Sequence, residues 1–210
     1  MQQPVVPANV DREQLRASIQ EKYTDVALTP EQGFHFHTGR PLAAMLGYPA
    51  ADVDRLPATT ADSFAGTGNP FSMGGLRPGE TVLDIGCGAG FDTLLAALQV
   101  GPGGRVISVD MTPAMLERTR EGARACGLPN VDPREGFAEE LPVESASIDV
   151  VISNGVINLT PDKMGVMRKI ARVLKPGGRV QIADIVVHRE CPRTRRMTSI
   201  SGRAESPALC

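Results

Sequence analysis

The sequence predicts a doubly wound α/β fold, and three observations support this prediction. From about residue 80 onward, short apolar runs of strand length alternate with segments of helical periodicity. Glycine-rich stops, GPGG at 101–104 and KPGG at 175–178, follow two of the helical segments. The run RVISVD at 105–110 is short and β-branched, as buried strands are. Strands that alternate with helices form a parallel sheet joined by crossover connections.

The first three elements follow one another closely. TVLDI at 81–85 is an apolar run of strand length, and we expect the first strand there. FDTLLAALQV at 91–100 has leucines at near-helical spacing and is stopped by GPGG. RVISVD, which comes next, is the predicted second strand.

The second helix is predicted over 112–127. Thr112 is a suitable N-cap, Pro113 fits the first helical position, and Gly127 is the expected stop. The segment NVDPREG at 130–136 is a weaker third strand, because its pattern is less apolar than that of its neighbours.

The last elements of the sheet have strong patterns. SIDVVISN at 147–154 predicts a fourth strand, and KMGVMRKIARVL at 163–174 predicts an amphipathic helix closed by KPGG. RVQIADIVV at 179–187 is the expected fifth strand. Only polar, unpatterned residues follow it, which leaves a sheet edge that needs protection by the tail or by a second subunit, as in a homodimer.

The chain is therefore divided into three segments. Residues 1–79 are expected to form an N-terminal helix, at DREQLRASIQEKYTDVA, and a cap that is loop-like at 34–49 and glycine-rich at 63–75. Residues 80–187 form the sheet domain, and residues 188–210 are an irregular tail with an incomplete sheet edge before them.

Composition excludes several classes of function. Hydrophobic residues make up 41% and charged residues 22% of the chain, as in ordinary globular proteins, and a net charge of −2 gives no field that attracts nucleic acid. No apolar run reaches the length needed to cross a bilayer, and the first residues do not resemble a secretory signal. The four cysteines are scattered and form no CxxC pair. We expect a cytoplasmic protein with free thiols, no metal site and no membrane partner.

The loop after the first strand, within VLDIGCGAGFD at 82–92, has the pattern of a nucleotide-binding turn. A phosphate-binding P-loop needs Lys and Ser or Thr, which this loop lacks, and a dinucleotide site needs G-x-G-x-x-G in place of G-x-G-x-G. Asp84 and Asp92 flank the loop and would repel a pyrophosphate. They suit a cationic ligand such as S-adenosylmethionine. The G-x-G-x-G spacing and Asp84 disfavour another hypothesis, that the chain is an NAD-dependent oxidoreductase.

Two later segments extend the predicted cofactor site. Asp110 ends the second strand, where a carboxylate accepts both ribose hydroxyls in doubly wound nucleotide folds. GFAEELP at 136–142 follows the third strand, where an adenine edge would lie.

At this point the chain resembles the class I S-adenosylmethionine-dependent methyltransferases, whose sheet is Rossmann-like, and within them the arsenite methyltransferase family. The resemblance spans roughly residues 60–187. It is carried by the strings SFAGTGNPF, VLDIGCGAGFDTLLAA, VISVDMTPAMLERTR, VISNGVINLTPDK and RVLKPGGRVQIADIV. The glycine loop and the resemblance together imply a set of cofactor-binding residues. These are Asp84, Gly86, Cys87, Gly88, Gly90, Asp110, Met111, Ala138, Glu139 and Asn154.

The resemblance also implies roles within that set. Asp84 and the loop glycines would face the methionine part of the cofactor, Asp110 and Met111 would hold the ribose, and Ala138 and Glu139 would flank the adenine. Asn154 would sit beneath the methyl donor. Cys87 is expected to be mainly a packing residue.

This chain departs from the arsenite family in its cysteines. The family has one cysteine where this chain has Thr67, another where it has Gly155, and a third in a tryptophan-containing stretch that is absent here. Soft trivalent arsenic prefers thiolate ligands. An acceptor would therefore have to arrive as a thiol conjugate, or be a different small molecule.

An acceptor with an ionisable proton would also need a base. The segment FHFHTGR offers His35, His37 and Arg40, of which His37 is the predicted catalytic residue together with Asn154. The leading hypothesis is a methyltransferase acting on a small acceptor, with arsenite as the family-level substrate. The alternative is a non-catalytic or truncated protein of the same fold that only binds the cofactor.

Overall fold

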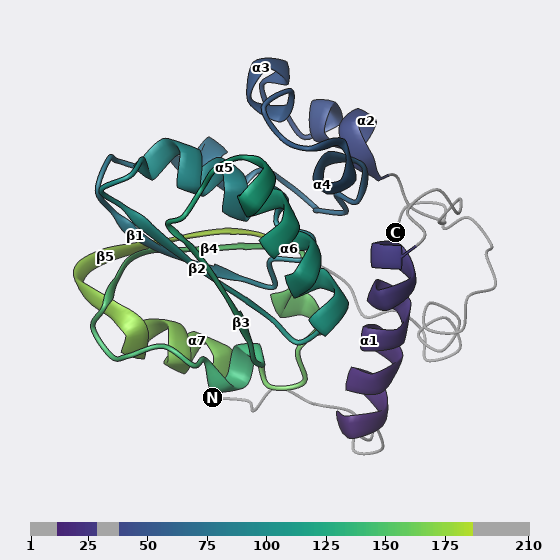
Figure 1. Cartoon of the computed structure of the whole chain (residues 1–210). Helices are drawn as coiled ribbons and strands as arrows, with labels where there is room; N and C mark the ends of the chain where they lie inside the picture. The colour runs from purple at the N-terminus through teal and green to yellow at the C-terminus, as the bar shows by residue number, and fades with distance from the viewer. Residues whose placement is uncertain (1–11, 29–37, 187–210) are drawn as a thin grey trace.

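The computed structural model describes residues 12–28 and 38–186. It confirms the doubly wound α/β prediction with one five-stranded, wholly parallel sheet of order β3-β2-β1-β4-β5 (Figure 1). The strands are β1 Thr81–Ile85, β2 Arg105–Asp110, β3 Val131–Glu135, β4 Ile148–Asn154 and β5 Leu174–Ala183.

The central strands are those with the strongest apolar patterns. β1 pairs with both β2 and β4, so both of its edges are paired, and four of its five residues are buried. β3 lies at one edge of the sheet, where Pro133 removes no ladder donor that the sheet needs, and its residues are half-buried or exposed. This edge position explains why its sequence pattern is weak.

Helices cover both faces of the sheet. α5 Phe91–Val100 and α6 Pro113–Ala125 lie on one face, and α7 Lys163–Val173 lies on the other (Figure 1). The predicted stops are confirmed, since α5 ends before Gly101 and α6 ends just before Gly127, which has a φ of +63°.

The KPGG stretch is a partial correction. α7 ends where it was expected to, but Lys175 to Gly178 belong to β5 and do not form a loop before it. A register shift between Ile148 and Val150 in the pairing of β4 with β5 accommodates these residues. Within the described residues β5 pairs only with β4, so its other edge is unpaired.

The N-terminal region contains more helix than predicted. α1 Arg12–Leu28 matches the expected helix, but the stretch interpreted as loop-like contains α2 Gly39–Met45. α3 Ala50–Val53 and α4 Ala58–Asp62 follow it. The prediction was wrong for α2 because Pro41 suits a first helical turn and Ala43 is fully buried against neighbouring elements.

The cap and the sheet domain share one hydrophobic cluster. Tyr48 and Phe64 of the cap pack with Phe91 of α5, and the Phe64 and Phe91 rings stack with centroids 4.0 Å apart. The Tyr48 ring meets Phe91 edge-on at 5.1 Å. This packing carries the Tyr48 hydroxyl to the carboxyl end of the sheet.

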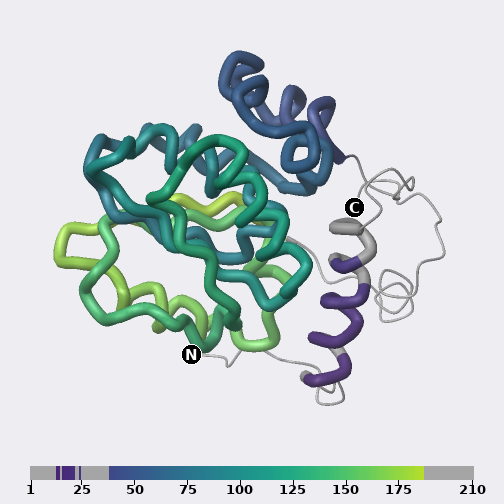
Figure 2. The backbone as a smooth tube through the Cα atoms, viewed as in Figure 1, coloured from purple at the N-terminus to yellow at the C-terminus, as the bar shows by residue number. Residues whose placement is uncertain are grey.

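α1 lies apart from α2, α3 and α4 and runs beside α6, as Figures 1 and 2 show. Among the described residues, none of the helices combines the length and the apolar character required to cross a membrane.

Candidate functional site

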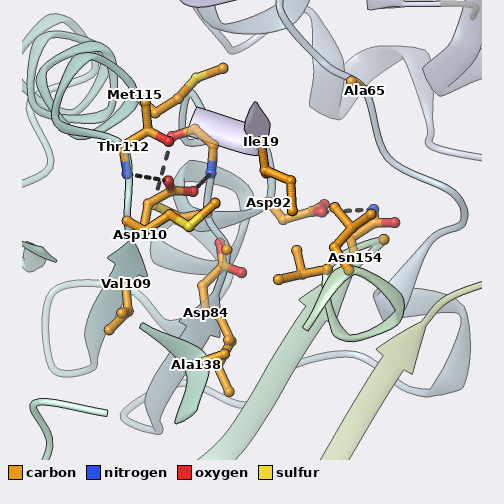
Figure 3. Close-up of a pocket in the computed structure, with 18 of the residues that line it drawn as sticks. Ile19, Ala65, Asp84, Asp92, Val109, Asp110, Thr112, Met115, Ala138 and Asn154 are labelled. Carbon is orange, nitrogen blue, oxygen red and sulfur yellow. Dashed lines mark hydrogen bonds between the residues drawn. The ribbon is translucent and has the colours of Figure 1, made fainter. Parts of the chain in front are cut away.

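A pocket lies at the carboxyl ends of β1, β2 and β4, beside the point where the strand order reverses (Figure 3). Ligands of open α/β sheets bind in this position, because the loops on either side diverge there. All but one of the predicted cofactor-binding residues line it: Asp84, Gly86, Cys87, Gly88, Asp110, Met111, Ala138, Glu139 and Asn154.

Gly88 and Gly90 have different surroundings in the loop between β1 and α5. Gly88 has a φ of +52°, and a Cβ on it would meet nothing within 4 Å, so its main chain faces open space in the pocket. Gly90 does not line the pocket. It precedes α5 with a φ of +89°, and a Cβ there would come within 2.9 Å of the Thr119 hydroxyl. Gly90 therefore serves the close packing of α5 against α6.

Asp84 is a buried carboxylate without a cationic partner. Its side chain is only 2% exposed, and the Thr93 hydroxyl donates to its Oδ2 at 2.6 Å. Among the described residues, no Lys or Arg forms an ion pair with it. Burial, and after it the charge of Asp92, raises the pKa of Asp84 to about 8. A cationic ligand at this carboxylate would reverse that shift.

Asp92, in the first turn of α5, is buried beside it. Tyr48 Oη donates to Asp92 Oδ1 at 2.7 Å, and Asn154 Nδ2 donates to Oδ2 at 2.9 Å. Burial raises the pKa of Asp92 to about 6, although these two hydrogen bonds oppose the shift. Burial also raises the pKa of Tyr48, so its hydroxyl remains a donor.

Asn154, at the end of β4, anchors the loop around Gly68. Its Oδ1 accepts from the main-chain N–H groups of Thr67 at 2.8 Å and Gly68 at 3.1 Å, and its Nδ2 donates to the Gly68 carbonyl at 2.8 Å. The amide lines the pocket itself, and it also holds the segment that directly follows the pocket-lining residues Ala65 and Gly66.

Asp110 ends β2 at the opposite side of the pocket from Asn154, with Asp84 between them (Figure 3). The main-chain N–H groups of Gly88 and Thr112 each donate to one of its carboxylate oxygens at 2.9 Å. Burial raises the pKa of Asp110, and these two donors partly offset the shift. The carboxylate is thereby held between the glycine loop and the start of α6.

Ala138 and Glu139 come from the short helical turn after β3, residues Ala138–Glu140. Glu139 Oε1 is buried without a hydrogen bond, and it forms an ion pair with Arg16 Nη2 at 3.5 Å. Sequence reasoning missed Arg16 and Ile19 of α1, which also line the pocket. Tyr48 was missed as well, because no local pattern links it to Asp92.

Cys87 lines the pocket, but its thiol is not a reactive group. The side chain is 7% exposed, and its Sγ lies 3.9 Å from the Thr119 hydroxyl. Burial raises the pKa of this thiol, so it stays protonated at neutral pH.

The structure does not test the predicted base. His37 and His35 fall outside the described residues. Arg40 is described, but it forms an exposed ion pair with Asp54 at 2.6 Å and does not line the pocket. The described residues contain no group of three or more His, Cys, Asp or Glu that could hold a metal ion.

The two positions that carry cysteines in the resembling family are neighbours in space. A Cβ at Gly155 would lie 2.9 Å from Thr67 Cγ2, although the residues are far apart in sequence. Gly155 lines the pocket next to Asn154. In this chain Thr67 and Gly155 therefore occupy the two neighbouring positions at which the resembling family would have a pair of cysteines.

Comparisons with known proteins agree with this geometry. A methyltransferase domain family matches residues 76–205. An arsenite methyltransferase of Halobacterium salinarum is 52% identical over 141 residues, which are 67% of this chain and 36% of that protein. A demethylmenaquinone methyltransferase of Bacillus cytotoxicus is 38% identical over 105 residues, which are 50% of this chain and 44% of that protein.

A solved structure resembles the chain in both fold and sequence. An arsenic(III) S-adenosylmethionine methyltransferase from Chlamydomonas reinhardtii superposes with a TM-score of 0.66 at 38% identity, over 72% of this chain and 53% of that one. The chain spans only about a third of the length of the two arsenite methyltransferases that it matches at 52% and 40% identity. Family, fold and cofactor pocket lead to one assignment: the chain belongs to the methyltransferase domain family, as a class I S-adenosylmethionine-dependent methyltransferase close to the arsenite methyltransferases.

Proposed function

We propose that this chain transfers a methyl group from S-adenosylmethionine to a small acceptor, with trivalent arsenic as the family-level substrate. One observation supports the proposal most strongly. Asp84, Asp92 and Asp110 surround a glycine loop at the carboxyl end of the sheet, and among the described residues none of them has an ion pair. A site that keeps three acids without a cation suits a ligand that brings its own positive charge.

The residues fit the parts of this cofactor. Asp84 lines the pocket with its pKa raised by burial, which an ammonium group would relieve. Asp110, held by two main-chain donors, presents a carboxylate to a ribose diol. When bound, S-adenosylmethionine supplies a methyl group that is already activated by its sulfonium.

The protein's own task is then to position the acceptor and exclude water. Asn154 fixes the loop of Thr67 and Gly68, and Tyr48 reaches the same amide through its hydroxyl at 3.1 Å. This network makes the acceptor side of the pocket rigid.

On the acceptor side of the pocket, positions 67 and 155 are occupied by Thr67 and Gly155, so neither position supplies a thiol. We therefore propose that trivalent arsenic would be used as a conjugate that carries its own thiolate ligands. The second candidate, a protein that binds the cofactor without catalysis, is favoured by the same pair of residues.

The first experiment is a calorimetric titration of S-adenosylmethionine into the wild-type chain and into Asp110→Ala. Binding that is lost in the variant would support the cofactor site, and no heat from a folded wild-type sample would refute the proposal. Transfer of labelled methyl to arsenite with excess glutathione then separates the two candidates. Binding without transfer to arsenite or to a panel of small acceptors would favour the non-catalytic protein.

A further inference from the structure

We propose that Arg16 of α1 is a cofactor-positioning residue, which holds Glu139 at the nucleoside end of the pocket and makes the docked α1 a part of the binding site. The proposal rests on the proposed function, because it assigns the nucleoside of the cofactor to this end of the pocket.

α1 is attached to the molecule through pocket residues. Gln20 Nε2 donates to the Met111 carbonyl at 2.5 Å, Arg16 forms the ion pair with Glu139, and the Arg16 guanidinium lies 4.2 Å from the centroid of the Phe137 ring. Met111, Phe137 and Glu139 all line the pocket. Docking of this helix and the shape of the pocket are therefore linked.

None of the described side chains of α1 is fully buried, and Gln14, Ala17, Ser18 and Glu21 are exposed. The contacts of Arg16 and Gln20 with the rest of the molecule are made to residues that line the pocket. A ligand that touches the docked face of α1 can therefore shift its docking equilibrium, and docking must strengthen ligand binding by the same factor.

Glu139 explains why Arg16 is needed. Its side chain is only 14% exposed, and its buried Oε1 has no hydrogen bond. A buried carboxylate without compensation is unfavourable, and Arg16 at 3.5 Å is the compensating charge. An exocyclic amine of a nucleobase is the donor that such an oxygen can accept from. Without Arg16, the carboxylate would turn toward solvent, and its acceptor oxygen would be lost to the ligand.

The test uses the full chain and S-adenosylhomocysteine, the stable demethylated form of the cofactor. Arg16→Met keeps the aliphatic length and removes the charge, Glu139→Gln keeps an acceptor oxygen, and the double variant measures their coupling. Glu21→Gln, on an exposed side chain of the same helix, is the matched control. The readouts are Kd, the dissociation rate, hydrogen exchange of amides 12–28 with and without ligand, and thermal unfolding of the free protein.

We expect Arg16→Met to raise Kd about tenfold, mostly through faster dissociation. We also expect it to abolish the ligand-dependent protection of amides 12–28 while leaving the unfolding temperature of the free protein close to that of wild type. In the Glu139→Gln background the same change should have little further effect. Equal Kd values for Arg16→Met and wild type, or the same loss in both backgrounds, would overturn this inference alone. A wild-type chain that does not bind S-adenosylhomocysteine would instead overturn the proposed function.

Discussion

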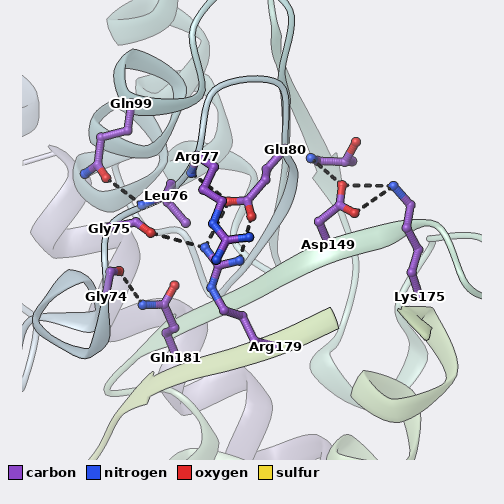
Figure 4. Close-up of polar contacts among 11 residues, drawn as sticks. Gly74, Gly75, Leu76, Arg77, Glu80, Gln99, Asp149, Lys175, Arg179 and Gln181 are labelled. Carbon is purple, nitrogen blue, oxygen red and sulfur yellow. Dashed lines mark hydrogen bonds and ion pairs between the residues drawn. The ribbon is translucent and has the colours of Figure 1, made fainter. Parts of the chain in front are cut away.

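Acidic side chains at the two ends of the parallel sheet have opposite electrostatic surroundings. At the amino end, Glu80 accepts from Arg179 at 2.6 and 2.9 Å, and Asp149 accepts from Lys175 at 2.9 Å (Figure 4). At the carboxyl end, Asp84 has a hydroxyl donor and no cation among the described residues.

The pKa values follow this difference. Hydrogen bonds from Arg179 lower the pKa of Glu80, and Lys175 and the Thr81 N–H lower that of Asp149 against the opposing effect of burial. Burial raises the pKa of Asp84 to about 8. The paired acids stabilise the fold, whereas the unpaired acid is an unfavourable feature that a cationic ligand can relieve. The comparison identifies the carboxyl end as the functional one.

The largest expected effect is that of Asp84→Asn on cofactor affinity. Removal of a buried charge that faces an ammonium should raise the Kd for S-adenosylmethionine on the order of 100-fold. Asp149→Asn, which removes an acid at the other end of the sheet, is the matched control and should leave Kd unchanged. Calorimetry measures both variants, and a similar Kd for Asp84→Asn and wild type would contradict the comparison.

The same acid should make cofactor binding depend on pH. Below about 8 the free protein holds a proton on Asp84, which must leave before a cation binds. Affinity should therefore rise from pH 6 to about 7.5, the range below the titration of an α-amino group, by up to about tenfold per unit. Titrations in buffers of different ionisation enthalpy would detect the released proton. A flat profile in wild type would show that Asp84 is already ionised.

The stability of the ligand-free protein should depend on pH in the opposite direction to cofactor affinity, falling as the pH rises. The folded pKa of Asp84 lies above its ordinary value of 3.8, so its contribution to stability is present in acid and is lost as pH rises through about 8. Asp84→Asn should therefore unfold at a higher temperature than wild type at pH 9, by a smaller margin near pH 6, and at a similar temperature only below about pH 3.8. Thermal unfolding without ligand measures the difference, and a less stable variant at pH 9 would argue against an unpaired charge.

Arg179→Met tests the amino end. We expect the free energy of unfolding at pH 7 to fall by about 1 kcal/mol, because two charge-assisted hydrogen bonds to a partly exposed pair are lost. Since the pKa of Glu80 is lowered, this loss should disappear in acid as Glu80 takes up a proton. Urea unfolding measures this loss of unfolding free energy. The Kd of the variant for S-adenosylmethionine should stay within about twofold of the wild-type value.

Lys175→Met should have the smallest effect, about 0.5 kcal/mol, because its pair with Asp149 is more exposed. The Lys175 side chain is 40% exposed and that of Asp149 is 31% exposed. Asp149 also keeps its bond from the Thr81 N–H at 2.8 Å. Urea unfolding beside Arg179→Met would show which pair matters more, and a larger loss for Lys175→Met would reverse the ranking.

The sequence by itself determined which segments from residue 80 onward form strands and which form helices. The apolar run of β1, the Pro113 start of α6 and the glycine stops after α5 and α6 are local signals, and the structure confirms them. Asp84 and Asp110 could be placed at the site because the ends of adjacent parallel strands always meet at one edge.

The tertiary structure alone decided how distant side chains meet. Tyr48 reaches Asp92 and Asn154, which are 44 and 106 residues away, and Thr67 meets Gly155. Gly90 packs on Thr119 away from the pocket, and Arg16 reaches Glu139 from a helix whose pattern does not indicate its partner. Local periodicity indicates which face of a helix or strand is apolar. These contacts depend instead on how distant elements of the sheet and the cap pack together. For that physical reason they could be read only from the folded chain.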